Sequence, residues 1–384
     1  MFSKDILDKF ENTLTPFWYY DQALLDRTLK QLKTEADRYG YLVHYALKAN
    51  AEDLLLKQIS KAGLGADCVS GNEISKAIEM GFAPNSIVFA GVGKSDKEIL
   101  TALSHNIHSF NCESIQELEV IDQLAAGQKK IAQVALRLNP NVNANTHKYI
   151  TTGLEENKFG INHWELEAIL AKLKILNHLK LIGLHFHIGS QITDLNVFKS
   201  LCLKVNEIQR WFQQHRIEVP NLNVGGGLGI DYHNPDEEAI VDFASFFKLF
   251  HDFLETAPGQ KVHFELGRAV VAQCGSLISK VLYIKDGVNT NFMILDAGMT
   301  ELIRPALYQS YHKIENLSNP SREFVRYDVV GPVCESSDCF GKAMQLPITK
   351  RGDLIAIRST GAYGKVMSSQ YNLRDKAKSL FSDK

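Results

Sequence analysis

The sequence lacks the features that mark membrane, nucleic-acid-binding and secreted proteins. No apolar run approaches the roughly 18 residues of a membrane-spanning helix. The formal net charge is only −2, so the charge balance gives no reason to expect binding to nucleic acid or to an anionic membrane. The opening stretch, MFSKDILDKFENT, carries charges where a secretory signal needs an apolar core. We therefore expect a cytoplasmic protein with neither a membrane nor a nucleic-acid partner.

Cysteine is also scarce and is not grouped. The chain has six cysteines in 384 residues, at positions 68, 112, 202, 274, 334 and 339. Cys334 and Cys339 lie near each other in sequence, but their spacing is at best a weak signal for a metal site. We predict reduced thiols, no metal site, and a packing role for five of the six cysteines.

Short β-rich runs alternate with longer amphipathic runs through most of the chain. The helical patterns include NEISKAIEMG, SIQELEVIDQLAAG, WELEAILAKLKIL and NVFKSLCLKVNEIQRWFQQH, the last with apolar residues at three- and four-residue spacing. The strand patterns are YLVHYAL (41–47), LGADCV (64–69), SIVFAG (86–91), IHSFN (107–111), IAQVALRLN (131–139), LIGLHFHIG (181–189), LNVGGG (222–227) and VHFE (262–265).

Eight successive strand–helix units are what a parallel (β/α)8 barrel of the TIM type requires. An open doubly wound sheet is the structural alternative. The number of units and the lack of an early G-x-G-x-x-G motif favour the barrel. We place this barrel at residues 27–275.

The pattern changes after about residue 275. LISKVLYIKDG, NFMILDAGM, VRYDVVGPV and DLIAIRSTGAYG are β-rich runs separated by turns, which predicts a mainly antiparallel β-domain. The N-terminal TPFWYYD is a further strand pattern, and we expect it to join the same domain. The second domain, a β-sandwich or β-barrel, is thus predicted to comprise residues 1–26 and 276–384.

Polar residues and glycines follow the predicted barrel strands, at the ends where β/α barrels carry their chemistry. These residues are Lys48, Asp67 with Ser70, Asn111 with Glu113, Asn139, His187 with Ser190, Gly225 to Gly227, and Glu265 with Arg268. Taken singly, each has an ordinary explanation. Lys48 would be a solvated charge, GGGLG (225–229) a turn, and His187 a structural histidine. Glu265 and Arg268 would form a surface ion pair.

Taken together, these strand ends match the chemical needs of pyridoxal 5'-phosphate. A lysine can form a Schiff base, and a glycine loop offers N–H donors to a phosphate. A carboxylate keeps a pyridine nitrogen protonated, and a flat imidazole can stack on a ring. Burying Glu265 would be costly unless a cation or a protonated heterocycle met it. The combination predicts pyridoxal phosphate carried by Lys48.

The chain resembles the barrel-type pyridoxal-phosphate decarboxylases, and within them the diaminopimelate decarboxylase branch. The resemblance covers nearly the whole chain through YALKAN, GADCVSGNE, HKYITTG, KFGI, HFHIGSQ, NVGGGLGIDY, FELGRAVV, LDAGMTELIRPALY, VVGPVCESSD and STGAYG. HIGSQ, GPVCESSD and IRPALY together separate the chain from the ornithine and arginine decarboxylases and from alanine racemase of the same fold.

The resemblance implies roles for individual residues. Lys48 matches the cofactor lysine, His187 the residue stacked on the ring, and Cys334 the acid that protonates the carbanion. Implied cofactor contacts are Ser190, Gly225, Gly226, Gly227, Glu265, Gly267, Arg268 and Tyr363, with Glu265 also at the pyridine nitrogen. Implied substrate ligands are Arg268, Arg304, Tyr308, Glu335 and Tyr363. The arginines suit the carboxylate remote from the reaction because a guanidinium binds carboxylate bidentately, and Glu335 suits the distal ammonium.

The resemblance also implies a reaction and an assembly. The reaction is decarboxylation of meso-2,6-diaminopimelate at its D centre to L-lysine and carbon dioxide, the last step of lysine biosynthesis. The β-domain of one subunit completes the barrel site of the other, so the implied active unit is a homodimer. One departure is ELGR, where the family usually has Glu-Pro-Gly-Arg. Leu266 lacks the fixed φ of proline, so we expect altered loop stiffness.

Alternatives inside and outside the enzyme class stay open at this point. Inside it are a carboxynorspermidine decarboxylase, which has a similar size and fold but lacks HIGSQ and CESSD, and another basic amino-acid decarboxylase of the same fold. A non-enzymatic pyridoxal-phosphate carrier also uses a barrel lysine, but it is a barrel alone, whereas residues 276–384 form a second domain here. Release of carbon dioxide from an amino acid separates an enzyme from a carrier.

Overall fold

The chain folds into two compact units. A computed structural model of the chain describes residues 2–142 and 158–383. The first unit, which we call the barrel unit, comprises Leu29–Gly229 and Asp242–Gly267. The second, the β unit, comprises Met1–Thr28, Ile230–Val241 and Arg268–Lys384.

The boundaries of these units differ from the predicted division at residues 27 and 275. Residues 27–28, 230–241 and 268–275 belong to the β unit, whereas the sequence placed them in the barrel. Hydrogen bonds explain part of this difference. The Gln273 side-chain amide donates to the Asp231 carbonyl at 2.8 Å, and its oxygen accepts from the Ser359 hydroxyl. The insertion after residue 229 is thereby tied to the β unit.

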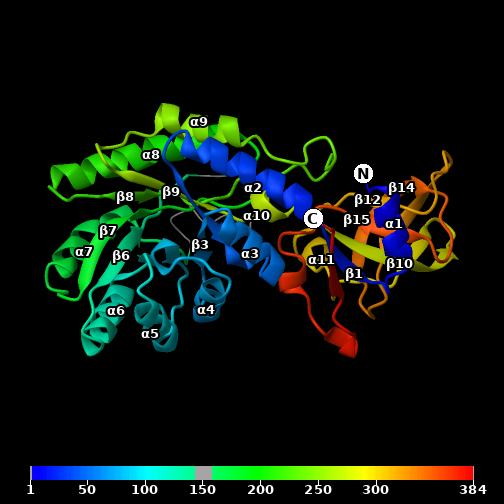
Figure 1. Cartoon of the computed structure of the whole chain (residues 1–384), viewed down its shortest axis with the longest axis horizontal. Coiled ribbons are helices and arrows are strands. Elements are labelled where there is room, and N and C mark those ends of the chain that lie inside the picture. The colour runs from blue at the N-terminus through cyan, green and yellow to red at the C-terminus, as the bar shows by residue number, and fades with distance from the viewer. Residues whose placement is uncertain (1, 143–157, 384) are drawn as a thin grey trace. The chain divides into compact units, whose positions relative to one another are not determined.

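The barrel unit contains a closed barrel of eight parallel strands, which confirms the predicted TIM-like fold (Figure 1). The strands are β2 (Leu42–Ala46), β3 (Gly65–Cys68), β4 (Ile87–Phe89), β5 (Ser109–Cys112), β6 (Ala132–Arg137), β7 (Leu179–His185), β8 (Asn221–Asn223) and β9 (Lys261–Leu266). The barrel closes where β9 pairs with β2, with Glu265 in register with His44. All eight predicted strand patterns form these strands.

Helices surround the barrel strands (Figure 1). They are α2 (Gln22–Asp37), which enters from the β unit, and α3 (Asp53–Lys61), α4 (Gly71–Glu79), α5 (Asp96–His105), α6 (Ile115–Gly127), α7 (Leu166–Leu173), α8 (Leu195–Gln214) and α9 (Phe243–Phe253). Short polar side chains start several of them. Ser70 and Ser114 accept hydrogen bonds from the N–H groups of Glu73 and Glu117, which satisfies donors that a helix start leaves unpaired. None of the described helices is long and apolar enough to span a membrane.

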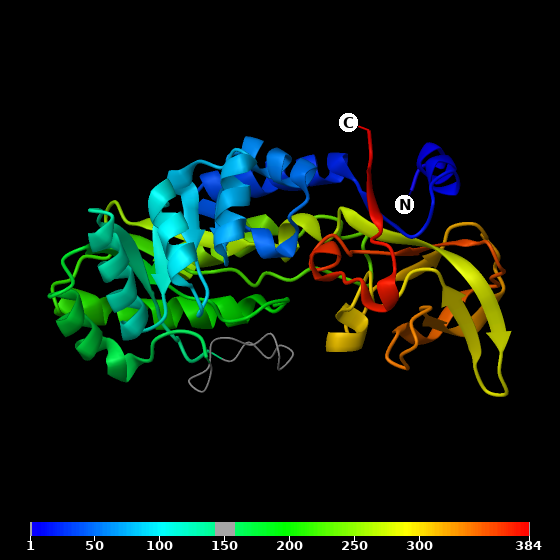
Figure 2. The ribbon, with the colours of Figure 1, turned by 90° about the horizontal axis from the view of Figure 1, so that it is seen from below.

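The β unit is built on a mainly antiparallel sheet, as predicted. Its strands are β1 (Phe17–Tyr20), β10 (Gly275–Asp286), β11 (Asn291–Leu295), β12 (Ile314–Asn316), β13 (Phe324–Val330), β14 (Cys339–Pro347), β15 (Leu354–Ile357) and β16 (Lys378–Phe381). The sheet order is β12-β15-β10-β11-β13-β14, and β1 pairs with β10 and β16. Figure 2 shows β10 and β11 as a long twisted hairpin. The short helices of this unit are α1 (Lys4–Glu11), α10 (Arg268–Val271) and α11 (Arg304–Tyr308).

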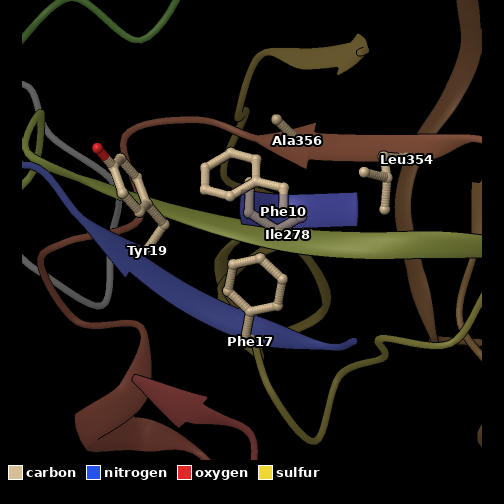
Figure 3. Close-up of a cluster of buried hydrophobic side chains, with 6 residues drawn as sticks. All are labelled: Phe10, Phe17, Tyr19, Ile278, Leu354 and Ala356. Atoms are coloured by element: carbon tan, nitrogen blue, oxygen red, sulfur yellow. The ribbon is translucent and has the colours of Figure 1, made fainter. Parts of the chain in front are cut away.

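The N-terminal strand joins the β unit through both pairing and packing. β1 is antiparallel to β10, with Phe17 opposite Ile278, which confirms the predicted strand. The Phe10 ring from α1 meets the rings of Phe17 and Tyr19 edge-on, with centroids 5.4 and 4.9 Å apart (Figure 3). These rings are buried in one apolar cluster with Ile278, so the N-terminal helix packs against the sheet of the β unit.

Two stacked imidazoles lie inside the barrel, below the ends of the strands. His44 Nε2 lies 2.8 Å from His263 Nδ1, and both side chains are buried. Burial lowers the pKa of His44 to about 4, and burial together with His44 lowers the pKa of His263 to about 2. The folded barrel therefore keeps both rings neutral at neutral pH, whereas unfolded histidines titrate near pH 6.5.

The histidine pair predicts a loss of stability in acid. Because the unfolded chain binds these protons at higher pH than the folded chain does, each imidazole should lower the free energy of unfolding. The loss should be about 1.4 kcal/mol per pH unit as pH falls from about 6.5 towards the folded pKa. Urea unfolding between pH 7.5 and 5 should give a shallower pH slope for His263→Gln than for wild type. His215→Gln, at an exposed position, is the matched control. Equal pH slopes for all three proteins would mean that the His44–His263 pair holds an added proton in the folded state. The Ser86 carbonyl would then accept from His44 Nδ1, and Asn221 Oδ1 would accept from His263 Nε2.

Candidate active site

Lys48 follows β2 directly, in a short turn of 3₁₀ helix (Leu47–Ala49). Its Nζ lies 3.1 Å from Oδ2 of Asp67, on the adjacent strand β3. The Lys48 side chain is 37% exposed, whereas that of Asp67 is 0% exposed. An amine paired with a fully buried carboxylate is not an ordinary solvated charge, so that explanation of Lys48 is wrong.

Asp67 has unused hydrogen-bonding capacity. Burial and the negative charge of Glu265 raise the pKa of Asp67, and Lys48 opposes this shift. Its Oδ1 is buried and has no hydrogen-bond partner in the part of the chain that the structure describes. A buried carboxylate oxygen of this kind, beside a primary amine, is typical of a site built for a polar ligand.

Glu265 lies at the centre of the barrel and is only 5% exposed. Its Oε1 accepts hydrogen bonds from the side-chain amides of Asn111 at 3.2 Å and Asn223 at 2.7 Å, and its Oε2 lies 3.0 Å from His185 Nε2. Burial opposes the charge, but the His185 imidazole and nearby cations outweigh burial and hold the pKa of Glu265 well below its ordinary value. The site therefore contains a buried, ionised carboxylate, and the explanation of Glu265 as part of a surface ion pair is wrong.

His187 follows β7 and presents a neutral imidazole. Its Nδ1 accepts a hydrogen bond of 3.3 Å from the Gly226 N–H, so the ring proton lies on Nε2. Burial and the cations Arg137 and Lys48 lower the pKa of His187 well below its usual range. An uncharged, flat ring is suited to stacking on a heterocycle, which is the role that the sequence predicts.

The glycines after β8 allow three backbone segments to meet. A Cβ at Gly226 would lie 1.7 Å from the Glu265 carbonyl, and one at Gly225 would lie 2.1 Å from the Phe186 carbonyl. Two of the N–H groups are used within the barrel, since Gly225 donates to Asn223 Oδ1 at 2.9 Å and Gly226 donates to His187. Close packing alone therefore explains why Gly225 and Gly226 are glycines. The phosphate contact of Gly225 to Gly227 remains a prediction.

Gly267 connects the end of β9 to the Lys48 turn. A Cβ at Gly267 would lie 3.0 Å from the Cβ of Ala49 and 3.2 Å from that of Ala46, the residues on either side of the Leu47–Lys48 pair. Leu266, the last residue of β9, is buried and pairs in register with Tyr45. The leucine that replaces the family's proline is therefore part of the strand.

The β unit brings together the two predicted substrate arginines. Arg268 and Arg304 both donate a hydrogen bond to the Tyr232 hydroxyl, at 2.5 and 3.0 Å. The Arg268 guanidinium also lies over the Tyr363 ring, 4.9 Å from its centroid. Tyr308 is the last residue of α11, the short helix that begins with Arg304. Four predicted residues thus belong to one region of the β unit.

Other predicted residues do not join these groups through described contacts. Cys334 and Glu335 are exposed, and Glu335 accepts a hydrogen bond from the Tyr371 hydroxyl at 2.7 Å. Of the six cysteines, four are buried and Cys339 is partly buried, so Cys334 is the exposed one. Ser190 is partly buried in the turn after β7. The motif HKYITTG (147–153) lies outside the described residues.

The residues that surround the predicted ones have functional contacts that the sequence pattern did not predict. His185, Asn111 and Asn223 hold Glu265, and Tyr232 joins the arginines. A signal did exist for two of them, because His185 and Asn223 lie two residues before His187 and Gly225 and so point to the same face of their strands. Tyr232 carried no such signal, since it is part of an insertion between β8 and α9.

Comparison with known proteins identifies the family. The pyridoxal binding domain of the pyridoxal-dependent decarboxylases matches residues 22–272. The diaminopimelate decarboxylase of Bacteroides thetaiotaomicron is 56% identical over 98% of both chains. The crystal structure of diaminopimelate decarboxylase from Helicobacter pylori complexed with L-lysine superposes with a TM-score of 0.92, at 39% identity, and covers 98% of this chain and 94% of that one.

This chain belongs to the diaminopimelate decarboxylase family. It is a pyridoxal-phosphate-dependent carboxy-lyase. A third relative, the diaminopimelate decarboxylase of M. jannaschii in co-complex with L-lysine, has a TM-score of 0.90 at 33% identity and covers 98% of this chain and 89% of that one.

The barrel residues of this decarboxylase fit its cofactor. Lys48 supplies a primary amine beside a buried carboxylate whose Oδ1 has no described partner. Glu265 is ionised, and a carboxylate oxygen can accept two hydrogen bonds, so Oε2 keeps capacity for a pyridine N–H beside its contact with His185. The donor and acceptor types at these strand ends are therefore those that pyridoxal phosphate needs.

Proposed function

We propose that the protein decarboxylates meso-2,6-diaminopimelate at its D centre and releases L-lysine and carbon dioxide. Lys48 and Glu265 are the residues that would hold the cofactor in the barrel. The observation that selects a substrate with a second carboxylate is the arginine pair, because Arg268 and Arg304 converge on one hydroxyl oxygen. A buried guanidinium binds a carboxylate strongly and rejects ligands that leave it unpaired.

Bound pyridoxal phosphate supplies a protonated ring that accepts electrons as carbon dioxide leaves. Glu265 would supply the negative charge for the pyridine nitrogen, and the side-chain amides of Asn111 and Asn223 orient its carboxylate. His187 presents a neutral ring for stacking. Its charge would otherwise oppose the protonated heterocycle.

Lys48 would hold the cofactor through its amine. Asp67 orients this amine at 3.1 Å and, because burial and Glu265 raise the pKa of the Asp67 carboxyl, can take a proton from Lys48 Nζ or return it. The protonation of the substrate carbon is assigned to the Cys334 thiol, and recognition of the distal ammonium to Glu335. Both assignments rest on the family resemblance.

The proposal predicts strong selection for the second carboxylate. The purified, cofactor-loaded protein should release carbon dioxide from meso-diaminopimelate, with kcat/KM at least about 10³-fold lower for lysine, ornithine and arginine, because each would leave a buried arginine unpaired. A substrate panel with product identification measures this. The LL isomer, which lacks a D centre, is the matched control and should give no product. Efficient turnover of ornithine would assign the chain to a polyamine branch instead.

We further infer that the protein acts as a homodimer with shared active sites. Exposure of Cys334 and Glu335 in the single chain supports this, because both are predicted to act on a substrate. A substrate-binding carboxylate on an exposed segment needs another surface to complete its site. In the family, that surface is the barrel of the partner subunit.

A mixing experiment tests this sharing. Lys48→Ala and Cys334→Ala chains, each nearly inactive, are dissociated, mixed and reassociated. If Cys334 acts in the partner's barrel, each mixed dimer has one site with both defects and one intact site. With random pairing and independent sites, about a quarter of wild-type activity should return. No recovery would mean that each chain uses its own Cys334, and a fully active monomer would contradict shared sites directly.

A further inference from the structure

Arg304 is a buried cation with neutral partners. It is 5% exposed, and burial lowers the pKa of its guanidinium below the ordinary value. Its described hydrogen bonds go to the Tyr232 hydroxyl at 3.0 Å, His312 Nε2 at 2.8 Å and the Ser310 hydroxyl at 3.3 Å. Among the described residues it forms no ion pair. A buried charge without a counter-charge is costly, so this arrangement needs an explanation.

The Tyr232 hydroxyl connects Arg304 to Arg268. A guanidinium has only donors, so the hydroxyl oxygen must accept from both arginines, at 3.0 and 2.5 Å. Both lone pairs of the oxygen are then used, and the O–H proton is left to donate. Tyr232 is 8% exposed and both arginines are buried, so the shared hydroxyl and the two guanidinium groups are packed together away from solvent.

His312 holds the other side of Arg304 and must be neutral to do so. Its Nε2 faces an arginine donor and must carry a lone pair, while its Nδ1 donates to the Arg358 carbonyl at 2.9 Å. Burial and the positive charge of Arg304 lower the pKa of His312 to about 3, so the ring stays uncharged at neutral pH. The ring is 1% exposed.

The acidic residues of this region are paired with a different arginine. Arg358 binds Asp236 at 2.8 Å and Glu315 at 2.6 Å, and it presents only its backbone carbonyl to His312. His312 contacts both arginines, through Nε2 to Arg304 and through Nδ1 to the Arg358 carbonyl. Arg304 keeps its full positive charge, and a neutral side chain fixes its direction.

We propose that Tyr232 and His312 are positioning residues that aim Arg304, beside Arg268, through neutral acceptors and so reserve the positive charge of Arg304 for the carboxylate of the substrate. This inference rests on the proposed function and extends it to two residues. A carboxylate in place of either acceptor would neutralise the site before substrate arrived. An apolar residue would leave the guanidinium groups free to rotate, and binding would then lose pre-organisation.

Tyr232→Phe is the most direct test because it removes one oxygen and keeps the ring. In the cofactor-loaded protein we expect KM for diaminopimelate to rise about tenfold or more, as for the loss of a hydrogen bond to a charged group, with kcat within about twofold. Tyr283→Phe is the matched control. The Arg351 guanidinium lies over the Tyr283 ring, 4.9 Å from its centroid. Tyr283 is 56% exposed and belongs to the second half of β10.

A pair of substitutions at His312 separates positioning from packing. His312→Gln keeps an acceptor oxygen near the place of Nε2 and should retain most of the wild-type KM. His312→Leu fills the space without an acceptor and should raise KM about as much as Tyr232→Phe. If His312 had only a structural role, the two variants would instead show similar losses in kcat, in the free energy of unfolding, or in both.

A binding measurement gives a readout without turnover. Calorimetry with pimelate, a dicarboxylate that lacks the amines, should show about tenfold weaker binding to Tyr232→Phe than to wild type and no change for Tyr283→Phe. If Tyr232→Phe binds pimelate more weakly than wild type but wild type does not decarboxylate diaminopimelate, the proposed function fails while the positioning claim stands. Unchanged KM and unchanged pimelate affinity in Tyr232→Phe would overturn the positioning claim.

Discussion

The buried charge of Glu265 is the constraint on which the barrel site depends. A carboxylate that is 5% exposed stays ionised only if donors surround it, and these come from three other strands, through Asn111 on β5, His185 on β7 and Asn223 at the end of β8. The same interaction therefore fixes the relative positions of four strand ends. It also leaves a negative charge facing the site beside Lys48, which suits a cofactor with a protonated ring.

The barrel unit and the β unit contain different charged groups at their predicted site residues. The barrel site contains the acidic groups Asp67 and Glu265 with the Lys48 amine, and burial lowers the pKa of His187, so that ring is neutral. The β unit contains the arginine pair, held by the neutral acceptors Tyr232 and His312. In each unit, uncharged side chains orient the charged ones.

Sequence patterns predicted the elements better than the contacts inside the site. The barrel strands are apolar runs with clear limits, whereas β14 was missed because glycine, lysine and glutamine interrupt its pattern and Ala343 has a positive φ of 57°. Lys48 and Glu265 were found because both lie at the carboxyl end of a predicted strand pattern. Their partners depend on which residues of different strands lie at the same height along the barrel axis. This register between strands is set by the closed sheet and cannot be read from any one segment.

The central claim is that Lys48 is the residue that carries pyridoxal phosphate, and chemical reduction of the holoprotein tests it most directly. Borohydride reduction fixes the cofactor to its lysine, and peptide mapping by mass spectrometry then locates the pyridoxyl group. The account predicts this mass on the peptide that contains Lys48, with none recovered there in Lys48→Ala. Recovery of the label on another lysine of the wild-type protein would contradict both the assignment of the site and the roles given to Asp67 and Glu265.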